Sequence, residues 1–233
     1  LPATFATEES GCSTLEITMY DKYADIEVVL IYTAFDKLDV ITRSAVITNK
    51  SEKPFKITRA LSACVDFDTD KMDMITLNGS WAREGAVERC RLHHGKQLVD
   101  SCRGESSHQN NPFVALCDNN ADEDKGEVFG FNFVYSGNFY AQAEVTQHKK
   151  TRFLMGINPL DFEWLLEKGE SFTCPEVVMV HSDEGIGKMS RTFHDLYRNN
   201  LIRGEYKDKR RPILINNWEA TYFNFDTDKL IDI

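Results

Sequence analysis

The chain has 233 residues, of which 37 are acidic and 27 basic, so its formal net charge is −10 at pH 7. Because a phosphate backbone is held by clustered Lys and Arg, this balance argues against a nucleic-acid partner. Hydrophobic residues make up 42% of the chain and aromatic residues 11%, which is enough for the packed core of one large all-β domain or two smaller domains.

From the start of the chain to about His181, apolar residues recur with a period of two, as in strands with one buried face. The alternation from Phe55 to Phe67 predicts one long strand, paired as a hairpin with the apolar run 41–47 through the polar connector 49–54. Further strands are predicted at 129–135 and 162–166, and Trp164 of the latter is expected in the core. Many strands with almost no helical period before residue 183 predict a large antiparallel β-sandwich.

After the strand 177–180 the apolar period changes to 3.6 residues, as in Met189, Phe193 and Leu196. This spacing predicts one amphipathic helix, with Ser182 or Asp183 as its N-cap and Gly204 just past its end. The basic segment 203–212 follows, and we interpret it as a solvated connector.

The last residues predict a short apolar strand at 213–218 and the start of a helix at 225–231. A strand that is apolar throughout is typically buried on both faces of a parallel sheet. In such a sheet a strand and helix are followed by another strand. We therefore expect the chain to stop one unit into an α/β domain, and a start at Leu1 rather than Met fits a piece of a longer protein.

The sequence shows no signal for a membrane, a signal peptide, a metal or a cofactor. No run of about 18 apolar residues occurs, and no basic region precedes an apolar one at the N-terminus. Six widely spread cysteines without a Cys-x-x-Cys pair favour free thiols in a reducing, cytoplasmic compartment. The residues with zinc-binding side chains are Cys90, His93, His94, Cys102 and His108. Their irregular spacing favours ordinary surface positions, and the acidic stretch 118–124 fits a loop better than a calcium site.

Two tryptophans are candidates for contact with a sugar. Trp81 follows the turn residues 78–80 and precedes Arg83 and Glu84, and Trp218 stands where the last predicted strand ends. A flat aromatic ring binds the apolar face of a sugar, while neighbouring polar side chains bind its hydroxyl groups. Packing inside the protein is the competing interpretation for both residues.

At these positions the sequence resembles a known family. The run Arg211–Phe223, with its Asn-Asn-Trp-Glu-Ala-Thr-Tyr-Phe segment, resembles the entry to the catalytic barrel of bacterial α-galactosidases of glycoside hydrolase family 36. Further segments resemble the family in order along almost the whole chain, and they are 79–84, 106–113, 135–138 and 175–179. The chain departs from the family at Asn110, where His is more common, and at Gly85, where a basic residue is more common.

The resemblance implies a retaining exo-glycosidase that removes terminal α-galactose from melibiose- and raffinose-type oligosaccharides. It implies a β-supersandwich at 1–181, a linker helix and basic connector at 182–212, and at 213–233 the first strand and start of the first helix of an incomplete (β/α)8 barrel. The two catalytic aspartates belong to later barrel strands in this family, so we expect this chain alone to be inactive. Trp218 and Trp81 match positions that line the galactose pocket, and homotetramers are common in the family.

Two other interpretations remain open. The chain could be a stand-alone module for carbohydrate binding or oligomer assembly, although the unfinished strand and helix argue against this. The same scaffold could also carry a different specificity, for α-N-acetylgalactosamine or for galactosyl transfer that forms raffinose.

Overall fold

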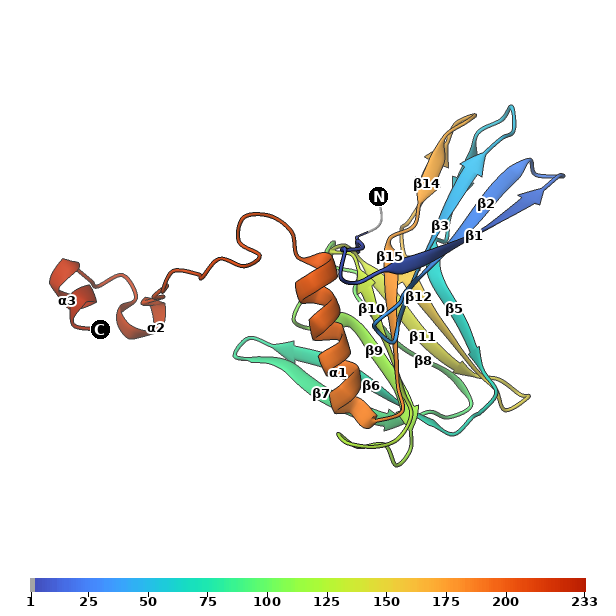
Figure 1. Ribbon diagram of the computed structural model, residues 1–233. Helices are drawn as coiled ribbons and strands as arrows, with labels where there is room; N and C mark the ends of the chain where they lie inside the picture. Colours follow the sequence, from blue (N-terminus) through green and yellow to red (C-terminus); the bar gives the residue numbers. More distant parts are fainter. Residues whose placement is uncertain (1–2) are drawn as a thin grey trace. The chain divides into compact units, whose positions relative to one another are not determined.

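The computed structural model describes residues 3–233, and these residues fold mainly as antiparallel strands up to Ser182 and as helices after it (Figure 1). The chain divides into two compact units, one that ends at Leu201 and one that runs from Ile202 to Ile233. The first unit contains all the strands of the described chain. No helix in residues 3–233 has the length and apolar character needed to cross a membrane.

Two sheets form the first unit. Across the large sheet the order is β1 (Cys12–Asp21), β2 (Ile26–Phe35), β3 (Val40–Asn49), β15 (Glu176–Ser182), β10 (Val128–Val134), β9 (Asn110–Asp118), β6 (Met72–Ser80) and β7 (Arg83–Arg91), with β14 (Ser171–Thr173) also on β3. The second sheet consists of β11 (Phe139–Val145), β12 (Thr151–Ile157) and β5 (Leu61–Phe67), and β8 (Gly95–Asp100) lies beside β11. A separate short pair is formed by β4 (Phe55–Ile57) and β13 (Trp164–Leu166).

The main core fills the space between the two sheets. Phe131 and Phe133 of β10 and Phe139 of β11 are at most 2% exposed and belong to one apolar cluster. Phe153 of β12 is fully buried, and its ring stacks on Phe131 with centroids 4.1 Å apart. The predicted face-to-face sandwich is confirmed, because alternate residues of β10 meet those of β11 and β12 between the two sheets.

The opposite face of the large sheet is covered by α1 (Gly185–Leu196) (Figure 1). Its apolar residues Met189, Phe193 and Leu196 form a second buried cluster with side chains of β9, β10 and β15. A Cβ at Gly130 would lie 2.5 Å from the Phe193 ring and 2.8 Å from Met189 Sδ, so a larger residue here would displace these helix side chains.

The predicted helix is thus confirmed, and a π-helical turn at Tyr197–Leu201 extends it. Its start differs from the prediction. Glu184 holds the N-cap position, and the Ser182 hydroxyl instead accepts a hydrogen bond from the Glu184 N–H (3.1 Å).

Two strand predictions were wrong. The run 55–67 is broken at residues 58–60 into β4 and β5, which belong to different sheets. The predicted hairpin between 41–47 and this run does not form, because β2 occupies one edge of β3 and β15 and β14 occupy the other. At the end of β3 the Asn49 side chain donates to the carbonyls of Lys53 and Leu166 (both 2.9 Å), which directs the chain toward β13.

The prediction that Trp164 lies in the core was also wrong, since this residue is 50% exposed. Its strand, β13, has one neighbouring strand, β4, and only Leu166 of β13 is buried. The Trp164 ring contacts Phe172 at a centroid distance of 5.3 Å. A three-residue strand with one partner buries too little surface to enclose an indole ring.

The second unit contains α2 (Trp218–Thr221) and α3 (Thr227–Ile231), but not the strand predicted at 213–218. Ile213 and Leu214 are 96% and 84% exposed, and no strand of residues 3–233 pairs with them. A strand needs a neighbour to satisfy its N–H and C=O groups, which explains the irregular backbone. The predicted helix start is confirmed by α3, where the Asp226 side chain accepts from the Lys229 N–H (2.9 Å).

All six cysteines are free thiols, and two of them are buried in the sandwich. Cys117 is 0% exposed and Cys174 is 2% exposed. Burial raises the pKa of both thiols from 9.0 to about 11, because the thiolate would lose its hydration. The folded chain therefore keeps these protons at a pH where the unfolded chain releases them.

This difference predicts a loss of stability in alkali. The stabilisation is fully present below the unfolded pKa of about 9 and disappears as the pH rises toward 11. We expect the Tm of the chain to fall more steeply between pH 9 and pH 11 than that of the double variant Cys117→Ala/Cys174→Ala. Cys64→Ala, at an exposed position, is the control, and parallel Tm curves for wild type and double variant would contradict the prediction.

Candidate functional site

Trp81 lies at the tip of the hairpin formed by β6 and β7. The strands pair from Asp73 opposite Arg91 to Ser80 opposite Arg83, which leaves Trp81 and Ala82 as the turn residues. Ala82 has a left-handed backbone (φ 58°), and its N–H donates to the Glu84 carboxylate (3.2 Å). The Trp81 side chain is 80% exposed, so its ring is free to contact a ligand.

The base of this turn is packed tightly against the loop that precedes β9. The Gly79 N–H donates to the Gln109 carbonyl (3.2 Å), and Asn78 lies opposite Asn110. A Cβ at Gly79 would lie 2.4 Å from the Arg83 carbonyl oxygen and 3.1 Å from that of His108. Glycine is therefore required where the two turns meet, and the loop positions the hairpin that carries Trp81.

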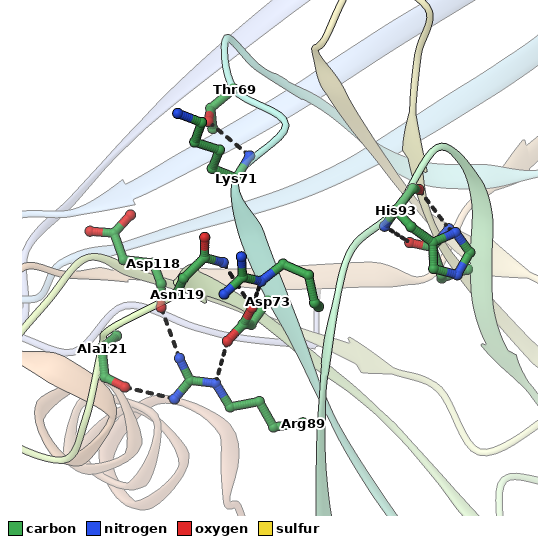
Figure 2. Close-up of polar contacts among 10 residues, drawn as sticks. Thr69, Lys71, Asp73, Arg89, His93, Asp118, Asn119 and Ala121 are labelled. Carbon is green, nitrogen blue, oxygen red and sulfur yellow. Dashed lines mark hydrogen bonds and ion pairs between the residues drawn. The ribbon is translucent and has the colours of Figure 1, made fainter.

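The other end of the hairpin is held by a buried carboxylate. The Asp73 side chain is 10% exposed and accepts from Arg89 Nε, Arg91 Nε and Asn119 Nδ2, each at 2.8 Å (Figure 2). Arg89 also donates to the carbonyls of Ala121 (2.6 Å) and Asp118 (2.9 Å). These bonds tie the edge strand β7 to the loop that follows β9.

No local sequence pattern marks this network. The residues of the network are far apart along the chain. Because charged residues are common throughout the chain, nothing in the sequence distinguishes Asp73, Arg89 and Arg91 from the others. The signal that finds them is the strand register, which places Asp73 opposite Arg91 and Arg89 two positions along the same strand.

A hollow of about 190 Å³ lies beside the base of the hairpin. The loop between β8 and β9 forms its walls, together with Asp100 at the end of β8 and Asn110 at the start of β9. Asn110, a position where the chain departs from the family pattern, donates from its side chain to the Asp100 carbonyl (2.8 Å).

Trp218 lies in the second unit, as the first residue of α2. Its N–H donates to Asn216 Oδ1 (3.0 Å), and its ring meets Tyr222 and Phe223 edge to face, at centroid distances of 5.4 and 4.9 Å. The side chain of Asn217, the N-cap residue of α2, donates to Thr221 Oγ1 (2.7 Å) rather than to the tryptophan. The Trp218 side chain is 44% exposed, so its ring is held by aromatic neighbours and still accessible.

The residues with zinc-binding side chains are not brought together. Residues 3–233 contain no group of three or more Cys, His, Asp or Glu side chains arranged to hold a metal ion. Cys90 and Cys102 are exposed, and desolvation followed by nearby carboxylates raises the pKa of both thiols, which keeps them protonated at neutral pH. Trp81 and Trp218 are both accessible indole rings with polar neighbours, a combination that suits contact with a sugar.

Comparison with known proteins gives consistent matches. The family model "Glycosyl hydrolase family 36 N-terminal domain" matches residues 1–167, and the model "Melibiase" matches residues 171–233. Alpha-galactosidase AgaA of Geobacillus stearothermophilus is 56% identical over all of this chain, which corresponds to 32% of that protein. Alpha-galactosidase C of Emericella nidulans is 43% identical over 99% of this chain and 30% of its own length.

Solved structures agree with these matches. A crystal structure of the Geobacillus alpha-galactosidase AgaA in complex with raffinose matches with a TM-score of 0.94. The match covers all of this chain and 32% of the AgaA chain. The alpha-galactosidase from Lactobacillus brevis has a TM-score of 0.94 at 39% identity, again over all of this chain and 31% of its own. The chain thus spans about a third of the length of the relatives that it matches.

Proposed function

Because the chain belongs to glycoside hydrolase family 36, we propose that it is the N-terminal part of an α-galactosidase that hydrolyses terminal α-galactosyl residues of melibiose- and raffinose-type oligosaccharides. One observation carries the proposal: the "Melibiase" match at 171–233 follows directly on the N-terminal-domain match at 1–167. Similar proteins are alpha-galactosidases, and crystal structures of the Geobacillus relative contain raffinose or stachyose.

In this proposal residues 213–233 begin the catalytic barrel. Ile213 and Leu214 are exposed in this chain, and they become a barrel strand when neighbouring strands cover them. Trp218 then stands at the C-terminal end of that strand, where the active sites of (β/α)8 barrels gather. The indole of Trp218 and that of Trp81 form parts of the pocket wall.

The chemistry needs groups that this wall does not provide. Retaining hydrolysis uses two carboxyl groups about 5–5.5 Å apart, one as nucleophile and one as acid and base. We assign both to the part of the enzyme that this chain does not cover, while the aromatic walls orient the sugar and exclude water.

The proposal extends to the compartment and the assembly of the enzyme. Six free thiols fit a reducing compartment, so we assign the enzyme to the cytoplasm. The homotetramer common in the family is the assembly that we propose for the intact enzyme.

Activity measurements on two proteins test the proposal. The full-length enzyme is expected to release p-nitrophenol from p-nitrophenyl α-galactoside, and a protein that ends at Ile233 is expected to give no release above background. Turnover by the shorter protein would contradict the assignment of the carboxyl groups. Faster turnover of the α-N-acetylgalactosaminide by the full-length enzyme would change the assigned specificity, and galactose binding by a full-length protein without hydrolysis would favour a binding module.

A further inference from the structure

The hollow beside the base of the Trp81 hairpin is lined by residues with polar side chains. The residues that line it are Asp100, Ser101, Cys102, Arg103, Ser107, Gln109 and Asn110. At about 190 Å³ it is smaller than the ~300–1,000 Å³ typical of pockets for drug-sized ligands. Its size therefore suits one small ring rather than an extended molecule.

Hydrogen bonds to the buried Asn158 and between the loop residues hold the walls of the hollow in place. Asn158 is 3% exposed, and its amide donates to Asp100 Oδ2 (3.0 Å) and to the Ser101 carbonyl (3.1 Å). The Ser101 hydroxyl donates to the Glu105 carbonyl (2.5 Å), and the Gly104 N–H donates to Asn138 Oδ1 (2.6 Å). A ligand would meet a wall that is already ordered, so little entropy is lost on binding.

Several polar groups of this wall have unused hydrogen-bonding capacity. The exposed Arg103 guanidinium makes no ion pair or hydrogen bond within residues 3–233. The Asn110 amide donates to the Asp100 carbonyl, which leaves Asn110 Oδ1 as an acceptor, and Asp100 Oδ1 is a second one. Together they provide both donors and acceptors.

The charges of the wall indicate an uncharged ligand. Arg103 and Asp100 are of opposite sign, so a phosphate would be attracted by one and repelled by the other. The thiol of Cys102 is neutral, because desolvation and the Asp100 carboxylate raise its pKa. A hydroxyl group both donates and accepts, so a sugar uses such a mixed set fully.

The hollow is joined to the hairpin that carries Trp81. The Gly79 N–H donates to the Gln109 carbonyl (3.2 Å), and Trp81 follows two residues later. Asn110, in the wall of the hollow, lies opposite Asn78 on β6. The hollow therefore lies at the base of the hairpin whose tip carries Trp81.

We propose that this hollow binds a sugar unit on the leaving-group side of the scissile bond, so that Arg103, Gln109 and Asn110 determine a preference for oligosaccharide substrates. The inference rests on the proposed function and adds a subsite to it. Contact with a sugar unit away from the scissile bond accelerates the reaction, because the binding energy is used to orient the bond that breaks.

Kinetics of the full-length enzyme test the subsite. In Arg103→Ala and Gln109→Ala we expect kcat/KM for raffinose to fall at least tenfold, while kcat/KM for p-nitrophenyl α-galactoside stays within twofold, because that substrate has no sugar as its leaving group. Arg103→Lys keeps the charge but not the fork of donors, and it is expected to give an intermediate loss for raffinose. Lys96→Ala, at an exposed position on β8, is the matched control.

The outcomes separate the subsite from the proposed function. Equal losses on both substrates, or no loss on raffinose, would overturn the subsite. A wild-type enzyme that cleaves neither substrate would overturn the proposed function itself. Because Arg103 is exposed and unpaired, its variants should keep the Tm of the wild type, and circular dichroism melting checks this.

Discussion

Phe153→Ala is expected to lower the free energy of unfolding by about 3–5 kcal/mol, the range found when a large core ring is removed. Phe153 is fully buried on β12, and its ring stacks on Phe131 from the opposite sheet with centroids 4.1 Å apart. Both sheets contribute to this contact, so neither can move to fill the cavity without disturbing its own strand pairing. Urea denaturation followed by tryptophan fluorescence and by circular dichroism measures the loss.

A substitution on the outside of the sandwich provides the comparison. Leu98 on β8 is 54% exposed, so Leu98→Ala is expected to change stability by no more than about 0.5 kcal/mol. Phe153→Leu keeps part of the apolar volume and should fall between the two. A cost below about 1 kcal/mol for Phe153→Ala would mean that the two sheets do not share a tightly packed core.

The architecture could be predicted because burial imposes a period on the sequence. The alternation of Phe129, Phe131 and Phe133 identified β10, and the spacing of Met189 and Phe193 identified α1. A period reports which face of an element is buried, and it reports this reliably when one face meets a core.

Strand neighbours could not be predicted in the same way. Alternation in 41–47 and 55–67 is satisfied by any partner that lies on the same side of the sheet, so it did not show that β2, β14 and β15 would occupy the edges of β3. The Asp73 network depends on that same long-range pairing. In β13 the alternation correctly placed Leu166 on the buried face. It could not show that the strand is too short to bury the Trp164 indole as well.

Some features of the candidate site could be predicted from neighbouring residues in the sequence, and others depend on contacts between distant residues. The exposure of Trp81 follows from a turn within a few residues of it, and the helix at Trp218 follows from residues 216–221. The hollow, by contrast, joins residues 100–110 with Asn158 and Asn138, which no local pattern connects. The family resemblance was drawn from short motifs along the chain. The match of the family model to residues 1–167 confirmed it.

Trp218→Ala in the full-length enzyme is expected to lower kcat/KM for p-nitrophenyl α-galactoside by about 5- to 150-fold. This range corresponds to about 1–3 kcal/mol, the size of stacking contributions measured for aromatic side chains on flat ligands. Trp218 is 44% exposed, and its ring makes edge-to-face contacts with Tyr222 and Phe223, so part of the indole is accessible and its position is fixed by these neighbours. Steady-state kinetics with wild type and variant at one pH measure the change.

Trp164→Ala is the matched control, because Trp164 is also a half-exposed tryptophan, 50% against 44%, and has no part in the proposed pocket. Its kinetics should equal those of the wild type. If Trp218→Ala instead keeps its kinetics and loses thermal stability, the ring serves to pack against Tyr222 and Phe223, and the pocket wall must be sought elsewhere. Sugar stacking predicts the opposite pattern, in which kcat/KM falls while the Tm changes little.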